Sequence, residues 1–337
     1  MDWREATFRT VLGLASKHGG GAAFFGDLES LAAEAYRKSL VGRAFPSFWL
    51  EVPLVGAPGF DLHVYYDRGD VLPDDRFEHG RGFGMQALFD WYFGSDVGGV
   101  GVGFAHDLRE GAAYSTGVYV NFNKHPLTDR SAFLRALDAE DAIGHTEALL
   151  DRLPKWWYTW YLGSFPRRAG SPTRVGAFVS RDRQAAYAAD KTLLARDLDQ
   201  AGFTAVDDAL LDCVAELAAL PFQLELQLDA TAEGTGDTLG VDLTLEMKSA
   251  KGVREAFTET GAGARACGLL EGWGIADDRW HNIAGASTAR IVPLASAEGK
   301  ASMLLTCVPS FIKVKWAGAR IQPAKVYFNC DARIVPI

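Results

Sequence analysis

The sequence predicts an α+β fold in which about ten strands form a closed antiparallel β-barrel and helices cover its outer wall. Three observations support this fold. Apolar positions change repeatedly from helical spacing to strict alternation along the chain. The alternating segments come in pairs, joined by short links that contain Gly or Pro. One face of each such segment is apolar, and the other carries charged, amide and aromatic side chains.

Five pairs of segments have the alternation expected of strands. Strands joined by short turns run antiparallel, whereas parallel strands need long crossovers, so we expect each pair to form a hairpin. The pairs are 47–54 with 61–67, 100–105 with 115–123, 156–164 with 173–180, 222–228 with 241–247, and 311–316 with 325–330.

Segments with helical spacing separate these hairpins. An amphipathic sheet usually turns its apolar face towards helices, so these segments are expected to cover the outside of the barrel. Helix and hairpin alternate five times. The five units share this order of elements but have no sequence identity with one another. The expected helices are 3–17, 28–40, 85–92, 129–153, 182–201, 206–220 and 253–270.

The polar face of the strands is unlike an ordinary solvated sheet face, because aromatic side chains stand among the charged ones. Trp49 alternates with Glu51, and Tyr65 alternates with His63. Lys, Glu, Thr and Ser would be expected on a face that meets bulk water. A mixture of aromatic, acidic and basic side chains indicates an enclosed lumen wide enough for a ligand.

Composition sets limits on the class of protein. A chain of 337 residues is long for one core, but barrels run long as single units, so we expect one barrel domain over 1–337, with two smaller domains as the alternative. The formal charge of −9 argues against a nucleic-acid partner, because phosphate backbones are bound by clustered Lys and Arg.

Location is inferred from what the sequence lacks. The four cysteines are far apart, as expected of thiols in a reducing compartment. The first twenty residues have neither the basic start nor the apolar run of a signal peptide. No stretch approaches the roughly 20 apolar residues of a membrane span. We therefore expect a cytoplasmic protein with no membrane partner.

Three segments carry a family resemblance: PSFWLEVPL, VGVGFAHDLREGAAYSTGVYVNF and the final hairpin PSFIKVKWAGARIQPAKVYFNCDA. They resemble the ABBA-fold prenyltransferases. The cyanobactin-type peptide prenyltransferases are the most similar branch. The resemblance implies five α-β-β-α repeats that close a ten-stranded barrel, also called a PT barrel.

The resemblance also implies an activity. Enzymes of this family move a prenyl group from an allylic diphosphate to an electron-rich acceptor. Inward Lys, Arg and Tyr side chains hold the diphosphate, aromatic side chains shield the allylic cation, and a Glu near the first strand accepts the acceptor's proton. We therefore expect transfer of a dimethylallyl or geranyl group to a peptide side chain or to a small aromatic or guanidino acceptor, in the biosynthesis of modified peptides or other natural products.

Cationic and hydroxyl side chains on the polar face are candidates for holding the diphosphate, since they can neutralise a leaving anion. The alternative is an ordinary charged sheet face. The candidates are Arg174, Lys313, Lys325, Tyr327 and Tyr119, with Lys315 pointing to the same side as Lys313.

Aromatic side chains on the same face are candidates for shielding the cation through their π-faces, with core packing as the alternative. They are Trp49, Tyr65 and Phe178, together with Tyr119. Glu51 is the candidate general base, because the neighbouring Trp49 could raise its pKa. An ion pair with a lumen Lys or Arg is the alternative for Glu51.

The fourth hairpin supplies an acidic wall that would separate a cationic acceptor from the diphosphate. A solvated surface is the alternative. The candidate acceptor-binding residues are His63, Glu225, Asp242 and Glu246.

Two departures from the family pattern reduce the number of cations. Gly117, Tyr119 and Asn121 occupy the fourth strand where relatives tend to place a cation, and His63 stands on the second. A same-barrel enzyme with different acid–base chemistry, or a noncatalytic ligand-binding barrel, is therefore the alternative. The seven histidines lack HxxxH or HxH spacing, so we expect no protein-held transition metal, and any Mg²⁺ would be held through the diphosphate.

Overall fold

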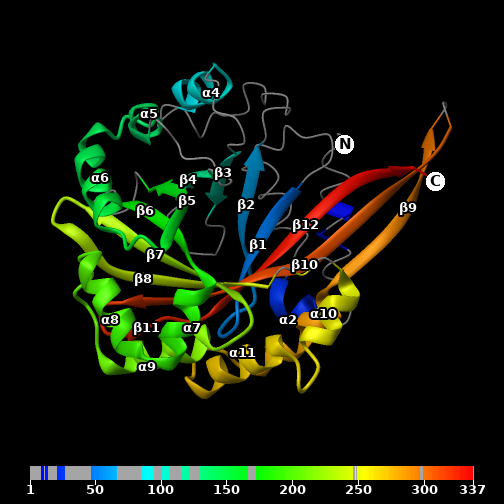
Figure 1. The fold of residues 1–337 in the computed structure, drawn as a ribbon. Helices are drawn as coiled ribbons and strands as arrows, with labels where there is room; N and C mark the ends of the chain where they lie inside the picture. Colours follow the sequence, from blue (N-terminus) through cyan, green and yellow to red (C-terminus); the bar gives the residue numbers. More distant parts are fainter. Residues whose placement is uncertain are drawn as a thin grey trace.

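Ten strands pair in one closed antiparallel ring in the computed structural model (Figure 1). Strands β1 to β8 follow one another in sequence order, β8 pairs with β10, β10 with β12, and β12 with β1. The ring strands are β1 (Ser47–Pro53), β2 (Asp61–Tyr66), β3 (Gly101–His106), β4 (Thr116–Asn121), β5 (Trp157–Ser164), β6 (Thr173–Val179), β7 (Gln223–Thr231), β8 (Gly234–Thr244), β10 (Gly299–Ala317) and β12 (Lys325–Pro336). The ten-stranded antiparallel barrel predicted from alternation is confirmed.

The structure describes part of the chain. The described residues are 9–10, 12–13, 21–26, 47–66, 85–94, 101–106, 116–121, 130–165, 172–245, 247, 249–296 and 299–336. The predicted helix at 28–40 and most of the one at 3–17 lie outside them. One domain over 1–337 stays a prediction.

Helices lie outside the ring (Figure 1), and each contributes side chains to the hydrophobic core. Helix α6 packs against β6, β7 and β8, and α2 packs against β1. The helices are α2 (Gly21–Phe25), α4 (Met85–Gly94), α5 (Arg130–Arg135), α6 (Ile143–Arg152), α7 (Arg181–Ala189), α8 (Lys191–Gln200), α9 (Asp208–Ala218), α10 (Ala250–Ala256), α11 (Ala262–Gly272) and α12 (Ile283–Ala286), with 3₁₀ turns η3 (Glu140–Ala142) and η4 (Asp278–Asn282). Within the described part of the chain, no helix is long and apolar enough to cross a membrane.

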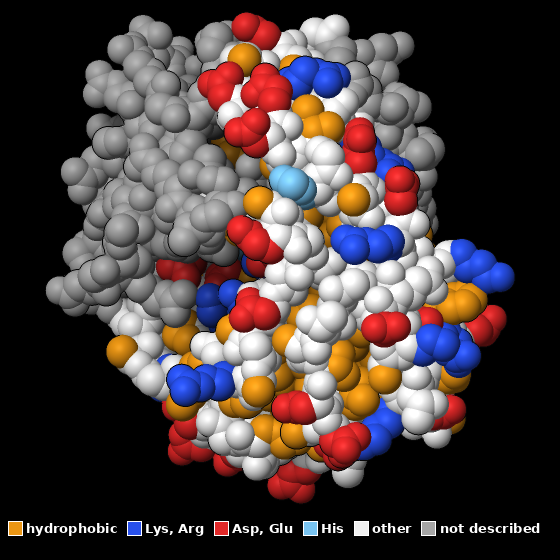
Figure 2. Space-filling model, turned by 90° about the vertical axis from the view of Figure 1, so that its left-hand side faces the viewer, with side chains coloured by type: hydrophobic (Ala, Val, Ile, Leu, Met, Phe, Trp, Pro, Cys, Tyr) orange, Lys and Arg blue, Asp and Glu red, His pale blue; other side chains and the backbone are white. Residues whose placement is uncertain are grey.

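The main hydrophobic core lies between the helices and the outer face of the strands. Leu224, Leu226 and Leu228 of β7 are buried there, as the alternation predicts. Figure 2 shows acidic and basic side chains interspersed over the described part of one outer face. Charges of one sign are therefore not concentrated on that face.

Three predicted helices are each broken in two. Over 182–201 the break is at Asp190, which ends α7 and caps α8 by accepting a hydrogen bond from the Thr192 N–H at 2.9 Å. Over 129–153, α5 ends at Arg135, and the turn that follows contains a left-handed residue, Asp138, with a φ of 53°. Over 253–270, α10 and α11 are separated by a turn that ends at Gly261. Helical spacing continues across these breaks, so the sequence pattern did not reveal them.

Strand β9 (Thr288–Ser296) and the first half of β10 were not predicted. They pair with each other, and β10 also pairs with the end of β12, so the three strands form an arm that projects from the barrel (Figure 1). The short strand β11 (Arg320–Ile321) pairs with the other end of β10. The arm lacks the alternation of polar and apolar residues used to recognise the other strands.

Glycines in the strands make room for large side chains in the lumen. Each of three tyrosine rings lies over the glycine that is its register partner on the next strand. The pairs are Tyr65 with Gly103, Tyr119 with Gly163, and Tyr161 with Gly176. A Cβ atom at Gly163 would lie 2.8 Å from Tyr119, and at Gly176 it would overlap the ring of Tyr161. The glycines thus set how closely the rings cover the wall.

We expect Gly176→Ala to destabilise the fold by about 1–3 kcal/mol, because the added methyl group overpacks the site of the Tyr161 ring. Urea denaturation measures the change. Gly268→Ala in α11 is the matched control. It should leave the fold as stable or make it up to about 1 kcal/mol more stable, because nothing lies within 4 Å of the added Cβ and Ala favours a helix over Gly. Equal stability of Gly176→Ala and the natural protein would contradict the close approach.

Candidate functional site

One line of register partners brings five predicted site residues to the same level of the lumen. Lys325 of β12 pairs with Lys313 of β10, Lys313 pairs with Asp242 of β8, and Asp242 pairs with Glu225 of β7. Glu225 pairs in turn with Phe178 of β6. Register partners on neighbouring strands have Cβ atoms about 5 Å apart, so this line forms a belt of charges that ends in an aromatic ring.

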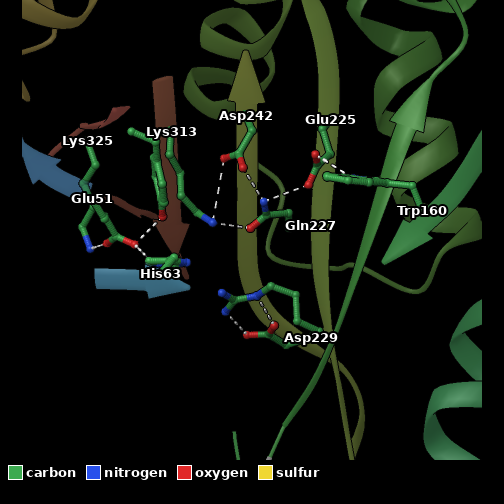
Figure 3. Close-up of polar contacts among 11 residues, drawn as sticks. Glu51, His63, Trp160, Glu225, Gln227, Asp229, Asp242, Lys313 and Lys325 are labelled. Atoms are coloured by element: carbon green, nitrogen blue, oxygen red, sulfur yellow. Dashed lines mark hydrogen bonds and ion pairs between the residues drawn. The ribbon is translucent and has the colours of Figure 1, made fainter. Parts of the chain in front are cut away.

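Glu51 lies at one end of the belt and has three partners (Figure 3). The Lys325 ammonium and the Tyr327 hydroxyl both donate hydrogen bonds to its carboxylate. The His63 Nε2 atom lies 3.0 Å from Glu51 Oε2. The sequence left two roles open for Glu51, and in this structure it forms the ion pair. We call Glu51, His63, Lys325 and Tyr327 the Glu51 cluster.

These partners determine the ionisation of Glu51. Burial by itself would raise the pKa of the carboxyl, but the charge of Lys325, the contact with His63 and the charge of Lys313 outweigh it and hold the pKa well below its usual range. The sequence-based expectation of a raised pKa is therefore wrong, because Trp49 is not the neighbour that decides it. Burial and the Glu51 charge raise the pKa of Tyr327, so its hydroxyl stays protonated and acts as a donor.

Glu225 and Asp242, which we call the acid pair, form the other end of the belt. The Gln227 amide nitrogen donates to both, at 3.0 Å to Glu225 Oε1 and 2.6 Å to Asp242 Oδ2. The Trp160 indole N–H donates to Glu225 Oε2 at 2.8 Å (Figure 3). Both carboxyl groups are buried, at 3% and 5% exposure, so the alternative of a solvated acidic surface is wrong for them.

The acid pair shares one nearby cation, Lys313. Its ammonium donates a hydrogen bond to the side-chain oxygen Oε1 of Gln227 and lies 3.8 Å from Asp242 Oδ1. Burial and the neighbouring Asp242 raise the pKa of Glu225 to about 8, and burial also raises the pKa of Asp242, which Lys313 partly opposes. At neutral pH the pair therefore retains a proton.

Arg174 is already bound inside the lumen. Its guanidinium donates two hydrogen bonds to Asp229, at 2.8 and 3.0 Å, and lies 4.8 Å from the centre of the Phe165 ring. Asp229 was not singled out in the sequence, although it continues the inward parity of β7. Arg174 can therefore meet a ligand anion only by sharing or leaving Asp229.

The predicted aromatic side chains lie in the lumen in two groups, and the second group includes two rings that were not predicted, Tyr161 and Trp160. Trp49 and Tyr65 meet edge to face with centroids 4.7 Å apart, and the Trp49 indole N–H donates to Ser310 at 3.0 Å. A second series joins Tyr119 to Phe178. Its successive centroid distances are 5.5 Å from Tyr119 to Tyr161, 5.4 Å from Tyr161 to Trp160 and 5.1 Å from Trp160 to Phe178.

A break in register explains why Trp160 and Tyr161 were missed. The pairing of β5 with β6 shifts between Thr159 and Tyr161. Strict alternation places only every second residue in the lumen, but here Trp160 reaches Glu225 and the adjacent Tyr161 lies over Gly176. The high proportion of aromatic residues in WYTWYL was the only sequence signal that Trp160 and Tyr161 could both belong to the lumen.

Two further candidates from the sequence are Glu246 and Lys315. Glu246 lies outside the described residues. Lys315 pairs with Gly240, one step along the same face from Lys313. No three His, Cys, Asp or Glu side chains gather to form a metal site in the described residues.

The raised pKa of Glu225 makes a prediction about stability. The folded state binds a proton that the unfolded state has lost between about pH 5 and pH 8, so the free energy of unfolding should fall as pH rises, by about 1 kcal/mol per pH unit. Glu225→Gln should flatten this slope, whereas Glu255→Gln on exposed α10 should not. Urea midpoints across this range measure it, and an unchanged slope in Glu225→Gln would contradict the retained proton.

Comparisons with known proteins identify the fold. No family model and no curated protein matches this chain. The solved structure of 5-dimethylallyltryptophan synthase from Streptomyces coelicolor matches 96% of this chain and 95% of its own, with a TM-score of 0.55 and 15% identity. The 6-dimethylallyltryptophan synthase from Micromonospora olivasterospora, in complex with DMASPP and Trp, matches 96% and 95%, with a TM-score of 0.55 and 14% identity. PriB in a binary complex with product diphosphate matches 96% and 94%, with a TM-score of 0.53 and 17% identity. This chain therefore has the ABBA prenyltransferase fold.

Proposed function

We propose that the protein is a prenyltransferase that transfers an allylic group from a diphosphate donor to an electron-rich acceptor inside the barrel. The observation that supports this most directly is the Glu51 cluster, in which a buried carboxylate is held by an ammonium and a phenol in an aromatic-lined lumen. The structural neighbours include enzymes named for dimethylallyl transfer to tryptophan and one bound to product diphosphate.

Lys325, Lys313 and Tyr327 are the proposed diphosphate ligands, with Arg174 and Tyr119 contributing from the opposite strands. Lys325 is more accessible than Lys313, with 27% of its side chain exposed against 13%. Charge-assisted hydrogen bonds from two ammonium groups would stabilise the negative charge that develops on the leaving oxygen. Because each cation already has a carboxylate partner, donor binding requires an exchange of partners.

The exchange couples donor binding to the strength of the base. When Lys325 turns towards the diphosphate, Glu51 loses the largest contribution that lowers its pKa, so its proton affinity increases. The C–O bond of the donor breaks, its electron pair leaves with the diphosphate, and the allylic carbon forms a bond to the acceptor. The proton displaced from the acceptor goes to Glu51.

The aromatic side chains would protect the allylic cation during this step. Tyr65 with Trp49 lies on one side of the lumen, and the series from Tyr119 to Phe178 on another. The negative π-faces of such rings attract a cation and exclude water that would capture it.

The finer assignments stay proposals. They are a dimethylallyl or geranyl donor with Mg²⁺ held through its diphosphate, a peptide or small aromatic or guanidino acceptor, a place in natural-product biosynthesis, and the cytoplasm. The cyanobactin-type resemblance supports a peptide acceptor, whereas two of the solved neighbours above are named for dimethylallyltryptophan.

Donor binding is tested by thermal unfolding. Dimethylallyl or geranyl diphosphate should raise the melting temperature of the natural protein, and Lys325→Gln and Tyr327→Phe should reduce that increase, because each removes a hydrogen bond to the diphosphate. Lys251→Gln on exposed α10 is the matched control and should respond like the natural protein. The proposed activity would be rejected if neither diphosphate raised the melting temperature.

The role of Glu51 is tested by Glu51→Gln. Turnover of labelled dimethylallyl diphosphate with a panel of tryptophan, tyrosine and arginine peptides should fall by about 10²–10⁴-fold, as expected for loss of a general base. Donor affinity should be kept or increased, since Lys325 is released from its carboxylate. Unchanged turnover would remove the assigned role, and Glu255→Gln controls for the loss of a carboxylate elsewhere.

A further inference from the structure

We propose that the acid pair, Glu225 and Asp242, binds a guanidinium group of the acceptor beside the Trp160 and Phe178 rings. The proposal rests on the proposed prenyl transfer and names the class of acceptor that this lumen would take. It further holds that the guanidinium replaces Lys313 beside Asp242, which allows Lys313 to turn towards the diphosphate.

An unsatisfied oxygen marks the site. Asp242 Oδ1 is buried and has no hydrogen-bond partner, and the Lys313 ammonium, at 3.8 Å, is too far for one. A buried acceptor without a donor is destabilising, so the site is incomplete without a further donor. Gln227 fixes both carboxyl groups through one amide nitrogen, so their positions are set before a ligand arrives.

The aromatic side of the site suits a flat cation. Trp160 and Phe178 are stacked with centroids 5.1 Å apart and planes 27° apart. The Trp160 ring is anchored to Glu225 by its indole N–H, so the stack begins beside the carboxyl group. Tyr158 packs on Phe178 at 5.6 Å and is 49% exposed, so this side of the lumen reaches solvent. A guanidinium is planar, weakly hydrated and able to bridge carboxylates while stacking on rings, whereas an ammonium is compact and strongly hydrated.

The balance of charge favours a cation over a neutral acceptor. The other groups that face the acid pair are Lys313 from β10, Tyr327 from β12, Arg174 from β6, Tyr161 from β5, Tyr65 from β2 and Glu51 from β1. Among them Arg174 is paired with Asp229, and Glu51 with Lys325. Lys313 is therefore shared by two carboxyl groups, and Glu225 retains its proton. A guanidinium would supply the missing positive charge and displace that proton.

The same exchange connects acceptor and donor. Lys313 and Lys325 are register partners, and two like charges at such positions repel each other unless an anion lies between them. Once a guanidinium neutralises Asp242, Lys313 is no longer needed beside that carboxylate. Lys313 and Lys325 can then both face the diphosphate. Donor and acceptor should therefore bind more tightly together than alone, by the same factor in either order.

Calorimetric titration tests the site without requiring turnover. N-acetylarginine amide is titrated into the full chain with dimethylallyl thiolodiphosphate present, and is compared with the neutral isostere N-acetylcitrulline amide and with N-acetyllysine amide bearing a free side-chain amine. The arginine probe should bind at least about tenfold more tightly than citrulline, which lacks the charge that pairs with the carboxylates. Binding of the arginine probe should release about one proton near neutral pH, seen as heat that depends on the buffer. As the pH is raised towards about 8, the affinity of the probe should increase about tenfold per pH unit.

Variants assign the effect to the acid pair. Glu225→Gln should abolish the proton release and, like Asp242→Asn, weaken arginine binding by at least about tenfold. Glu255→Gln should leave both unchanged, and melting curves show whether each variant is folded. If a variant is unfolded, the pH dependence and proton release of the natural protein still decide the question.

The outcomes separate this proposal from prenyl transfer itself. If the donor analogue binds but citrulline binds as tightly as arginine, or Glu225→Gln binds arginine unchanged, the acid-pair site is overturned while prenyl transfer stands. Tighter binding of the lysine probe than of arginine would overturn the guanidinium assignment. If the arginine probe binds with proton release but no allylic diphosphate binds, the cation site is supported and the proposed activity fails.

Discussion

Closure of the barrel is the constraint on which the rest of the structure depends. The pairings of β12 with β1 and of β8 with β10 turn a sheet with one polar face into a wall around a lumen. A charge inside that wall cannot be fully solvated, and an unpaired buried charge costs several kcal/mol. Three of the lumen cations therefore have an acidic partner there: Lys325 has Glu51, Lys313 has Asp242, and Arg174 has Asp229.

The same constraint gives two carboxyl groups opposite properties. Glu51 lies beside a lysine and has a lowered pKa, whereas Glu225 lies beside another carboxyl group and has a pKa raised to about 8. Groups whose environments separate their pKa values in this way are suited to different tasks in one reaction. Glu51 is ionised and able to accept a proton. Glu225 is protonated, and a cation can take the place of its proton. The order of charges around the belt, more than burial alone, determines this difference.

Sequence reasoning predicted what depends on the period of two and missed what depends on long-range contacts. Alternation alone showed that Glu51, Asp242 and Lys313 share one face. It did not show that Tyr327 would bond to Glu51, 276 residues away, because the pairing of β12 with β1 is a property of the closed ring. The pKa of Glu51 was misjudged for the same reason, since its sequence neighbour was known and its cross-strand partner was not.

Local irregularities account for most of the other misses. The register shift in β5 brings Trp160 to Glu225, and the cap formed by Asp190 divides one predicted helix into two. Neither feature changes the overall apolar pattern, so neither is visible in periodicity. The arm formed by β9 and the first half of β10 was missed because its strands lack alternating faces.

The small number of cations in the lumen follows from how its wall is built. On β4, where the family resemblance leads one to expect a cation, Gly117 instead makes room for the Phe165 ring, and Tyr119 fills the space over Gly163. Rings thus occupy positions that charges would otherwise take, and Phe165 packs on the guanidinium of Arg174. In this lumen Lys325, Lys313 and Arg174 are each matched by a carboxylate. A diphosphate would upset that balance unless positive charge entered with it, and a cationic acceptor beside Glu225 and Asp242 would provide that charge without any change in the wall.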